Sequence, residues 1–213
     1  MRIGFIFECQ PDGPDEKVYK CYIERLRIAN EVGAFDIDSA CLVNLPKLKA
    51  DCGDTASAFL ASGCQHVFIC WDLYPSHDEA APDCVDQRTE VEASLTAAGV
   101  NLNDVTLLCI RKELESWLIA DASAVLSFWN TNRGRAPRIA HIGSPDGHDD
   151  PKKHLTKTFT TTLKRGRYEP HYHAEQLARN ASLARVASSQ SFCRLVCKLK
   201  LLSPGTVNAL CGC

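Results

Sequence analysis

The sequence predicts an α/β fold, in which a mostly parallel sheet of about four strands lies between layers of helices and is followed by a helical extension. Three observations support this prediction. Short apolar runs alternate with amphipathic stretches through residues 1–130. Residues 66–71 are continuously apolar at their centre, as in a strand that is covered on both faces. Beyond residue 150 the pattern is helical, and Phe192, Leu195, Val196 and Leu199 share one face.

The first two strands are predicted from the apolar runs at residues 3–7 and 39–44, the second of which is the weaker. The other two strands are predicted at residues 66–71 and 105–110. Amphipathic stretches separate all four runs, so we expect parallel pairing with right-handed crossovers.

Helices are predicted between these strands, at residues 15–32, 54–61 and 83–98. In the first of them, apolar side chains recur every three or four residues along one face. Gly33 follows this pattern directly and is expected to end the helix as its C-terminal cap.

After the fourth strand, residues 112–129 are predicted to form one continuous helix. Residues 130–150 contain several Gly and Pro without periodicity, which indicates a linker or a long functional loop. Further helices are expected at residues 152–163, 172–187 and 191–202. The chain therefore divides into an α/β domain at residues 1–130 and a basic, mostly helical extension at residues 131–213.

Composition limits the class of protein. Of the 213 residues, 45% are hydrophobic and 23% are charged, which is typical of a globular protein and excludes disordered, collagen-like and coiled-coil proteins. No apolar run reaches the roughly 20 residues that a membrane span requires, and no export signal is recognisable. We expect a cytoplasmic protein without a membrane partner, and homo-oligomerisation is left open.

The twelve cysteines are spread through the chain, and none of them forms a Cys-x-x-Cys pair. Cys193 and Cys197 are four residues apart on a predicted helix, and Cys211 and Cys213 flank Gly212 in the C-terminal tail. Because the chain has ample apolar residues for a core, most cysteines are expected to be reduced thiols. A structural zinc site is the alternative, although such sites favour short paired spacings.

Charge divides the chain into two unlike halves. Residues 1–110 contain 8 Lys and Arg against 18 Asp and Glu, whereas the remaining residues contain 16 against 8. Residues 133–200 alone contain 14 basic and 5 acidic side chains, with aromatic residues interleaved. This distribution fits an acidic cation site beside a basic surface for DNA or RNA. Alternatively, the two halves neutralise each other across their interface and the basic residues form solvated helix faces.

Acidic side chains follow three of the four predicted strands. Glu8 follows the first strand, Asp72 follows the third, and Glu113 and Glu115 come shortly after the fourth. Carboxyl ends of parallel strands meet at one edge of a sheet, where ligands usually bind. Carboxylates together with water and substrate phosphate hold hard cations, so Mg²⁺ or Mn²⁺ is expected here. Each acid taken alone could instead cap a helix.

Several blocks of the sequence resemble those of a Toprim-like family of bacterial proteins of unknown function. This family is related to nuclease effectors that accompany an ATPase in phage-defence systems. The most specific block is Glu-Ser-Trp-Leu-Ile-Ala-Asp at residues 115–121. The other matching blocks are Phe7-Glu8-Cys9, Asp15-Glu16-Lys17-Val18-Tyr19, residues 67–72, Asp150-Pro151-Lys152-Lys153 and Ser189-Gln190-Ser191-Phe192.

The resemblance implies a Toprim-like three-layer domain at residues 1–130. It also implies a metal-dependent nuclease that cleaves nucleic-acid phosphodiesters in phage defence, together with a partner ATPase. Glu8 matches the catalytic glutamate and is also expected among the metal ligands. Asp72 matches the principal ligand of Mg²⁺ or Mn²⁺.

Further site residues come from the later blocks. Positions two apart on a helix point about 200° away from each other, so Glu113 and Glu115 are not expected to face the same ion. Glu115 is preferred as the third metal ligand because it lies within the matching block. Lys152 and Lys153 also lie in a matching block, and we expect both to act in catalysis beside the scissile phosphate.

The sequence departs from the family pattern at two positions. Cys9 replaces the Gly that usually follows the first glutamate, and Tyr74 replaces the second Asp of an Asp-x-Asp pair. Asp78 is a further candidate for the missing carboxylate. The alternative function is a non-catalytic binding subunit that recruits a partner ATPase or nucleic acid. A small-molecule phosphotransferase or hydrolase is a third reading, and it would not depend on Lys152 and Lys153.

Overall fold

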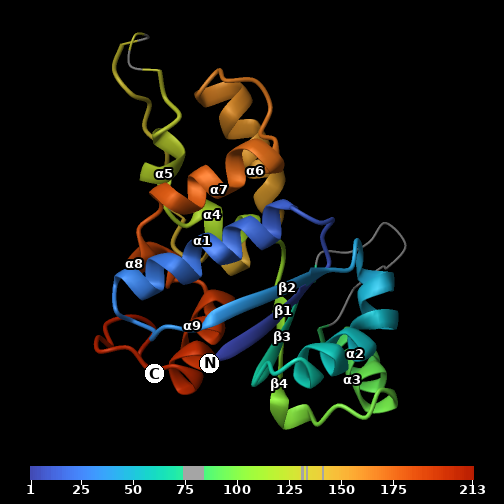
Figure 1. Cartoon of the computed structure of the whole chain (residues 1–213). Helices are drawn as coiled ribbons and strands as arrows, with labels where there is room; N and C mark the ends of the chain where they lie inside the picture. The colour runs from blue at the N-terminus through green and yellow to red at the C-terminus, as the bar shows by residue number, and fades with distance from the viewer. Residues whose placement is uncertain (74–83, 131, 133, 141) are drawn as a thin grey trace.

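Four parallel strands form the sheet at the centre of the molecule, in the spatial order β2-β1-β3-β4 (Figure 1). The computed structural model describes residues 1–73, 84–130, 132, 134–140 and 142–213. Helices cover both faces of the sheet, so the predicted α/β fold of three layers with C-terminal helices is confirmed. The strands are β1 (Arg2–Phe7), β2 (Asp36–Cys41), β3 (His66–Asp72) and β4 (Val105–Ile110).

Side chains of β1 and β3 alternate between two apolar cores, one on each face of the sheet. Phe5 and Phe68 belong to the larger core, whereas Ile6 and Val67 belong to the smaller one. Because both faces are buried, the strands are continuously apolar, as their sequence predicts. The covering helices are α1 (Pro14–Ile28) over the larger core, and α2 (Leu45–Ala61) and α3 (Cys84–Ala97) over the smaller one.

Helix α1 ends at Ile28, four residues before its predicted end, and Gly33 is not its cap. Asn30 adopts the left-handed conformation that turns the chain, with a φ of 57°. The Gly33 N–H donates to the Ser203 carbonyl at 2.8 Å, and a Cβ atom at Gly33 would lie 2.7 Å from Ser203 Oγ. Glycine therefore permits the close approach of the C-terminal segment at this position.

Helix α2 begins at Leu45, nine residues before its predicted start. Asn44 caps it, because its side chain accepts a hydrogen bond from the Lys47 N–H at 3.0 Å. Pro46 in the first turn is also compatible with a helix N-terminus. The prediction missed this half of the helix because it depended on apolar spacing and gave no weight to the cap.

The C-terminal helices are shorter and more numerous than predicted. Residues 112–129 form two helices rather than one, and residues 172–187 are also divided. The 3-10 turns are η1 (Leu102–Asp104) and η3 (Pro145–Gly147), and η4 (Thr158–Thr162) is a π-helical turn. The helices are α4 (Glu115–Ile119), α5 (Ala122–Leu126), α6 (Pro151–Lys157), α7 (Pro170–Asn180), α8 (Leu183–Val186) and α9 (Gln190–Leu202).

Asp121 lies at both of these breaks. Its Oδ1 accepts the Ser123 N–H at 2.9 Å and so caps α5, and its Oδ2 accepts the Ser182 N–H at 2.7 Å between α7 and α8. A side chain that satisfies backbone donors from two distant segments favours ending the helices there. Asp121 thus caps α5 and also binds the start of α8.

Trp117 of α4 lies at the centre of the larger core and is fully buried. Its ring lies 4.9 Å from that of Tyr19 on α1 and 5.2 Å from that of Phe192 on α9, measured between centroids. Its Nε1–H donates to Ser191 Oγ at 2.8 Å. Residues on both sides of the boundary at residue 130 therefore share one core, and that boundary remains a prediction.

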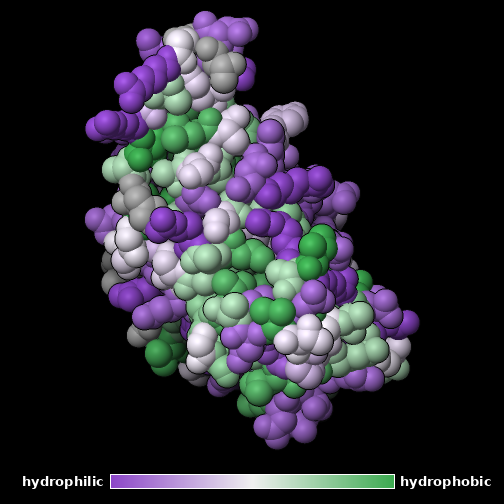
Figure 2. Space-filling view, turned by 90° about the vertical axis from the view of Figure 1, so that its left-hand side faces the viewer, coloured by the Kyte–Doolittle hydropathy of each residue, from purple (hydrophilic) through white to green (hydrophobic). Residues whose placement is uncertain are grey.

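Eight of the twelve cysteines form no disulfide, as predicted for most of them. The other four form the disulfides Cys193–Cys211 and Cys197–Cys213, which connect the C-terminal tail to α9. Figure 2 views the side of the molecule that carries α5, α7 and α8, where hydrophilic and hydrophobic residues are intermixed. Within the described residues, we find no helix with the length and apolar character needed to cross a membrane.

Candidate functional site

The structure brings Glu8 and Asp72 together at the carboxyl edge of the sheet. Glu8 follows β1 and Asp72 ends β3, and these two strands are neighbours. The Asp72 N–H donates to Glu8 Oε2 at 3.3 Å, and the Leu114 N–H donates to Asp72 Oδ2 at 3.1 Å. Parallel register thus places the first two predicted site residues side by side.

A third acid, Asp15, completes this region, and the sequence analysis did not assign it to the site. Asp15 lies in the first turn of α1, and its negative charge raises the pKa of both Glu8 and Asp72. In a strand–loop–helix unit, the helix begins near the carboxyl end of the strand that precedes it. Its position in the first turn after β1 was therefore the signal that could have identified Asp15.

Glu115 is the fourth acid, and it is nearly inaccessible, with 7% of its surface exposed. It begins α4, and its Oε1 accepts a hydrogen bond from the Tyr168 hydroxyl at 3.3 Å. After burial and the charges of Asp15 and Glu8, the charge of Glu115 is a further cause that raises the pKa of Asp72. We call Glu8, Asp15, Asp72 and Glu115 the carboxylate cluster.

Burial and mutual repulsion both favour the protonated forms in this cluster. Burial, with a smaller effect from the charge of Asp15, raises the pKa of Glu8 to about 8. Burial also raises the pKa of Asp15 to about 6, although the Lys152 ammonium acts in the opposite direction. The pKa of Asp72 lies well above its usual range for the same reasons, burial being the largest. The cluster therefore retains protons near neutral pH.

Glu113 lies beside the carboxylate cluster but faces another partner. Its Oε2 accepts the Lys152 backbone N–H at 3.2 Å, at the start of α6. Burial, followed by the charge of Glu115, raises the pKa of Glu113 to about 7. The two glutamates thus interact with different groups, as expected from their spacing, although the helix itself begins only at Glu115.

Lys152 is the cation next to the carboxylate cluster. Burial raises the pKa of Asp15 and of Glu115, and the positive charge of Lys152 opposes this rise in both. Lys153 is exposed, and its backbone N–H donates to the capping Asp150 side chain at 2.8 Å. Both lysines line a cavity of about 480 Å³, which also includes Glu113, Arg167 and Tyr168.

Of the positions that depart from the family pattern, the structure describes Cys9 but not Tyr74. Cys9 Sγ lies 3.7 Å from Cys41 Sγ at the end of β2, so the residue in the glycine position contacts the neighbouring strand. Tyr74 and Asp78 lie outside the described residues. The contribution predicted for Asp78 therefore remains a prediction.

The donor chemistry of the carboxylate cluster fits a hard divalent cation. All of its ligating atoms are carboxylate oxygens, and a cation would relieve the repulsion that raises their pKa values. Among the described residues, no three His, Cys, Asp or Glu side chains are arranged to hold a metal ion together. Mg²⁺ commonly uses only one or two carboxylates with water and substrate phosphates, and this mode requires no such group.

Comparison with known proteins gives one match. The model of a family described as a domain of unknown function, DUF4276, matches residues 35–200. This range includes Asp72, Glu115 and Lys152, whereas Glu8 and Asp15 precede it. No curated protein and no solved structure matches the chain.

Proposed function

The chain belongs to the DUF4276 family, a domain of unknown function, and we propose that it is a metal-dependent nuclease of Toprim-like type. One observation supports this proposal above all others. Four acidic side chains from separate elements gather at the carboxyl edge of the sheet beside Lys152. Such a combination of carboxylates and a cation suits the cleavage of a phosphodiester.

In this proposal, Asp72 would hold Mg²⁺ or Mn²⁺ together with Glu8 or Glu115, and such an ion would supply positive charge against the charge that develops on the phosphate. Glu8, which matches the catalytic glutamate of the Toprim-like pattern, would act as a general acid toward the leaving oxygen. Burial, which raises its pKa to about 8 in the metal-free protein, favours the protonated form that this role requires. Asp15 supports that role because its charge helps to raise the pKa of Glu8.

Lys152 and Lys153 bind the phosphate in this proposal. Both line the 480 Å³ cavity next to Glu113, and Arg167 contributes a third cation to its wall. The substrate is DNA or RNA, whose backbone is held by cations of the C-terminal extension. The role in phage defence and the partner ATPase belong to the same proposal, and they rest on the matching sequence blocks.

The proposal is tested by cleavage assays with duplex DNA, single-stranded DNA and RNA in the presence of Mn²⁺. Glu8→Gln and Asp72→Asn should each reduce cleavage about hundredfold or more, because each removes a group that acts in the reaction. Glu24→Gln is the matched control, since Glu24 is an exposed glutamate on α1 whose ion-pair partner is Arg27. Full activity of Glu8→Gln, or cleavage that persists in a chelator, would contradict the proposal.

A second candidate function is a non-catalytic binding subunit that recruits a partner ATPase or nucleic acid. It is favoured by the observation that no three metal-ligating side chains of the described residues converge. Calorimetric titration of Mn²⁺ into the wild type and Asp72→Ala separates the two functions. Binding that disappears in Asp72→Ala supports the nuclease. If neither protein binds Mn²⁺, in the absence or presence of a non-cleavable oligonucleotide, the binding subunit is favoured.

A further inference from the structure

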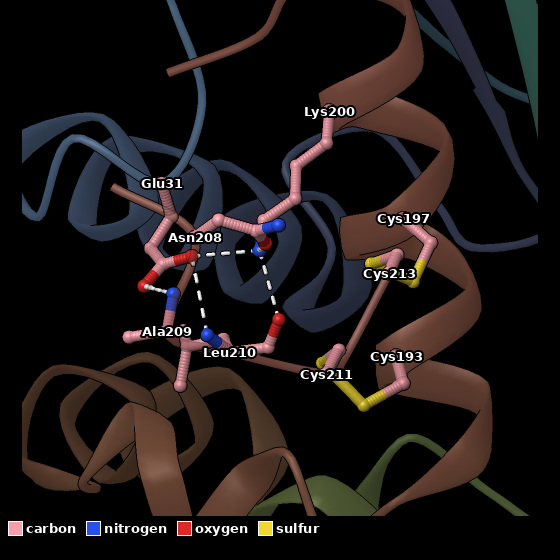
Figure 3. A network of polar contacts seen from close by, with 9 residues as sticks. All are labelled: Glu31, Cys193, Cys197, Lys200, Asn208, Ala209, Leu210, Cys211 and Cys213. Atoms are coloured by element: carbon pink, nitrogen blue, oxygen red, sulfur yellow. Dashed lines mark hydrogen bonds and ion pairs between the residues drawn. A yellow bond between two sulfur atoms is a disulfide. The ribbon is translucent and has the colours of Figure 1, made fainter. Parts of the chain in front are cut away.

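Four cysteines gather on one side of α9 at the C-terminal end of the chain (Figure 3). Cys193 and Cys197 lie one helical turn apart, and Cys211 and Cys213 of the tail lie opposite them. The paired Cα atoms are 5.2 Å apart for Cys193 and Cys211, and 5.6 Å apart for Cys197 and Cys213. Both disulfides therefore lie on the same side of α9. Sulfurs held in disulfides are not metal ligands, in agreement with the finding that no three metal-ligating side chains converge among the described residues.

Non-covalent contacts hold the tail in this position independently of the disulfides (Figure 3). Glu31 accepts the backbone N–H groups of Ala209 at 3.1 Å and Leu210 at 3.3 Å. Lys200 of α9 forms a buried ion pair with Glu31 at 2.7 Å and donates to the Leu210 carbonyl at 2.8 Å. Reduction of the disulfides would leave these contacts intact, so the four thiols would remain close to α9.

The backbone of the tail turns the last cysteines toward the helix. Cys211 and Gly212 both adopt left-handed conformations, with φ values of 66° and 60°. This turn lets both Cys211 and Cys213, which are separated by one residue, reach α9 (Figure 3). On the helix, Cys193 and Cys197 share one face because residues four apart lie one above the other.

We propose that these four cysteines, when reduced, form a structural zinc site. Zn²⁺ in such sites is tetrahedral and is commonly bound by four thiolates at about 2.3 Å, which keeps the sulfurs about 3.8 Å apart. Side-chain rotation at the observed Cα separations of 5.2 and 5.6 Å is sufficient to reach this spacing. Zinc would then connect the tail to α9 as the disulfides do.

The cysteines outside the two disulfides are consistent with reduction of the four at the tail. Eight of them are thiols, and Cys9 and Cys41 stay unpaired with their sulfurs only 3.7 Å apart. Thiols in contact are typical of a reducing environment, in which exposed disulfides do not persist. Cys213 is exposed and Cys193 is half-buried, so a reductant and a metal ion can both reach the four sulfurs.

The charge of the surroundings also suits such a site. Four thiolates around Zn²⁺ have a net charge of about −2, which nearby cations stabilise. Arg194 and Lys198 are the residues that follow Cys193 and Cys197 on α9. Lys200 lies within the same network, where it binds Glu31 and the tail.

The chemical steps balance with a monothiol such as glutathione as the reductant. Each disulfide takes two electrons and two protons from two monothiols, which gives two cysteine thiols and one external disulfide. Zn²⁺ then displaces the four thiol protons as four Zn–S bonds form. Oxidation of the four thiolates by a small disulfide reverses both steps and releases the ion.

The test uses the full chain, reduced with a phosphine and freed of metal by a chelator, and Co²⁺ as the probe. We expect thiolate-to-cobalt charge-transfer bands and the ligand-field bands of a tetrahedral ion, with one Co²⁺ per chain. Zn²⁺ should remove these bands by displacement, and a thiol-oxidising disulfide should release the bound Zn²⁺. Carboxylates give no thiolate bands, so the result does not depend on the carboxylate cluster or on nuclease activity.

Two double variants make the assignment specific. Cys211→Ser with Cys213→Ser removes both tail ligands and should abolish the thiolate-to-cobalt bands, while circular dichroism confirms that the protein is folded. Cys9→Ser with Cys41→Ser removes a close pair elsewhere in the chain and should leave the bands unchanged. The proposal is overturned if the reduced, folded wild type shows no such bands, or if they persist in the tail variant.

Discussion

At the scale of single residues, Asp15 shows how a side chain can affect a site to which its matching block did not assign it. Acidic residues are common in the first turn of a helix because the helix dipole favours them, so Asp15 has the sequence signature of an ordinary helix start. The charge of Asp15 affects Glu8 and Asp72 because the first turn of α1 lies at the carboxyl edge of the sheet. Its effect on the site is therefore electrostatic.

Replacing Asp15 with Asn should lower the pKa of Glu8. Burial is the largest cause of the raised value of about 8 and remains, so the new value should still lie above the ordinary one of 4.5. The measurement is an NMR titration of the Glu8 carboxyl carbon in metal-free protein. Asp12→Asn, in an exposed position before α1, is the control and should leave the midpoint unchanged. An unaltered midpoint in Asp15→Asn would refute the electrostatic link.

The carboxylate cluster should make the metal-free protein less stable as pH rises. Folding raises the pKa of Glu8 from about 4.5 to about 8, so its stabilising contribution is complete below about pH 4.5. That contribution is lost as pH rises through about 8. Asp15, with a pKa of about 6, acts in the same direction at lower pH.

Urea unfolding at several pH values between 5 and 9, in the presence of a chelator, measures this effect. The free energy of unfolding of the wild type should decrease over this range, and that of the Glu8→Gln variant should decrease less. Added Mn²⁺ should restore stability to the wild type at the alkaline end, because a cation favours the charged carboxylates. Parallel pH curves for the two proteins would show that Glu8 does not cause the decrease.

At the scale of elements, the structure shows which sequence signals suffice and which do not. β3 and β4 begin at the predicted residues because strands buried on both faces are continuously apolar. The break after α7 was not predictable, because it depends on Asp121 accepting the Ser182 N–H, 61 residues away, whereas the break after α4 coincides with the local cap that Asp121 forms with the Ser123 N–H. Local periodicity includes no such contact. The same limit applies to the site, where Glu8 and Asp72 were predicted from strand ends but Asp15 was not.

Asp121→Ala should destabilise the protein by about 1–3 kcal/mol, since it removes a helix cap and leaves two backbone donors without their acceptor. Asp121 is 6% exposed, so water does not readily replace these hydrogen bonds. Asp54→Ala, at an exposed position of α2, is the control and should change the free energy of unfolding by less than about 0.5 kcal/mol. Equal stabilities of the two variants in urea would contradict the role of Asp121.

At the scale of the whole molecule, the larger core connects the sheet to the C-terminal helices. Trp117 contacts Tyr19 from the first helix and Phe192 from the last, which are far apart in the sequence. The sequence predicted that a helical extension exists, but not which face of the sheet it covers. That information lies in pairs of side chains whose complementarity appears only once the chain is folded.

Because Trp117 lies between the two segments, the chain should unfold in one cooperative transition rather than as two domains. Near-ultraviolet and far-ultraviolet circular dichroism should report the same midpoint in urea. Trp117→Ala should lower the free energy of unfolding by about 3–5 kcal/mol and should keep the two signals coincident. Two separate midpoints in the wild type would instead support independent domains divided near residue 130.

The position of α9 has a consequence for synthesis on the ribosome. All four strands and α1 leave the ribosome before Phe192, Leu195 and Leu199, which complete the larger core. Until these residues emerge, the face of the sheet around Trp117 lacks part of its apolar cover. A nascent chain paused before residue 190 therefore presents a surface that chaperones bind and that promotes aggregation. Emergence of α9, rather than pairing of the last strand, completes protection of the core.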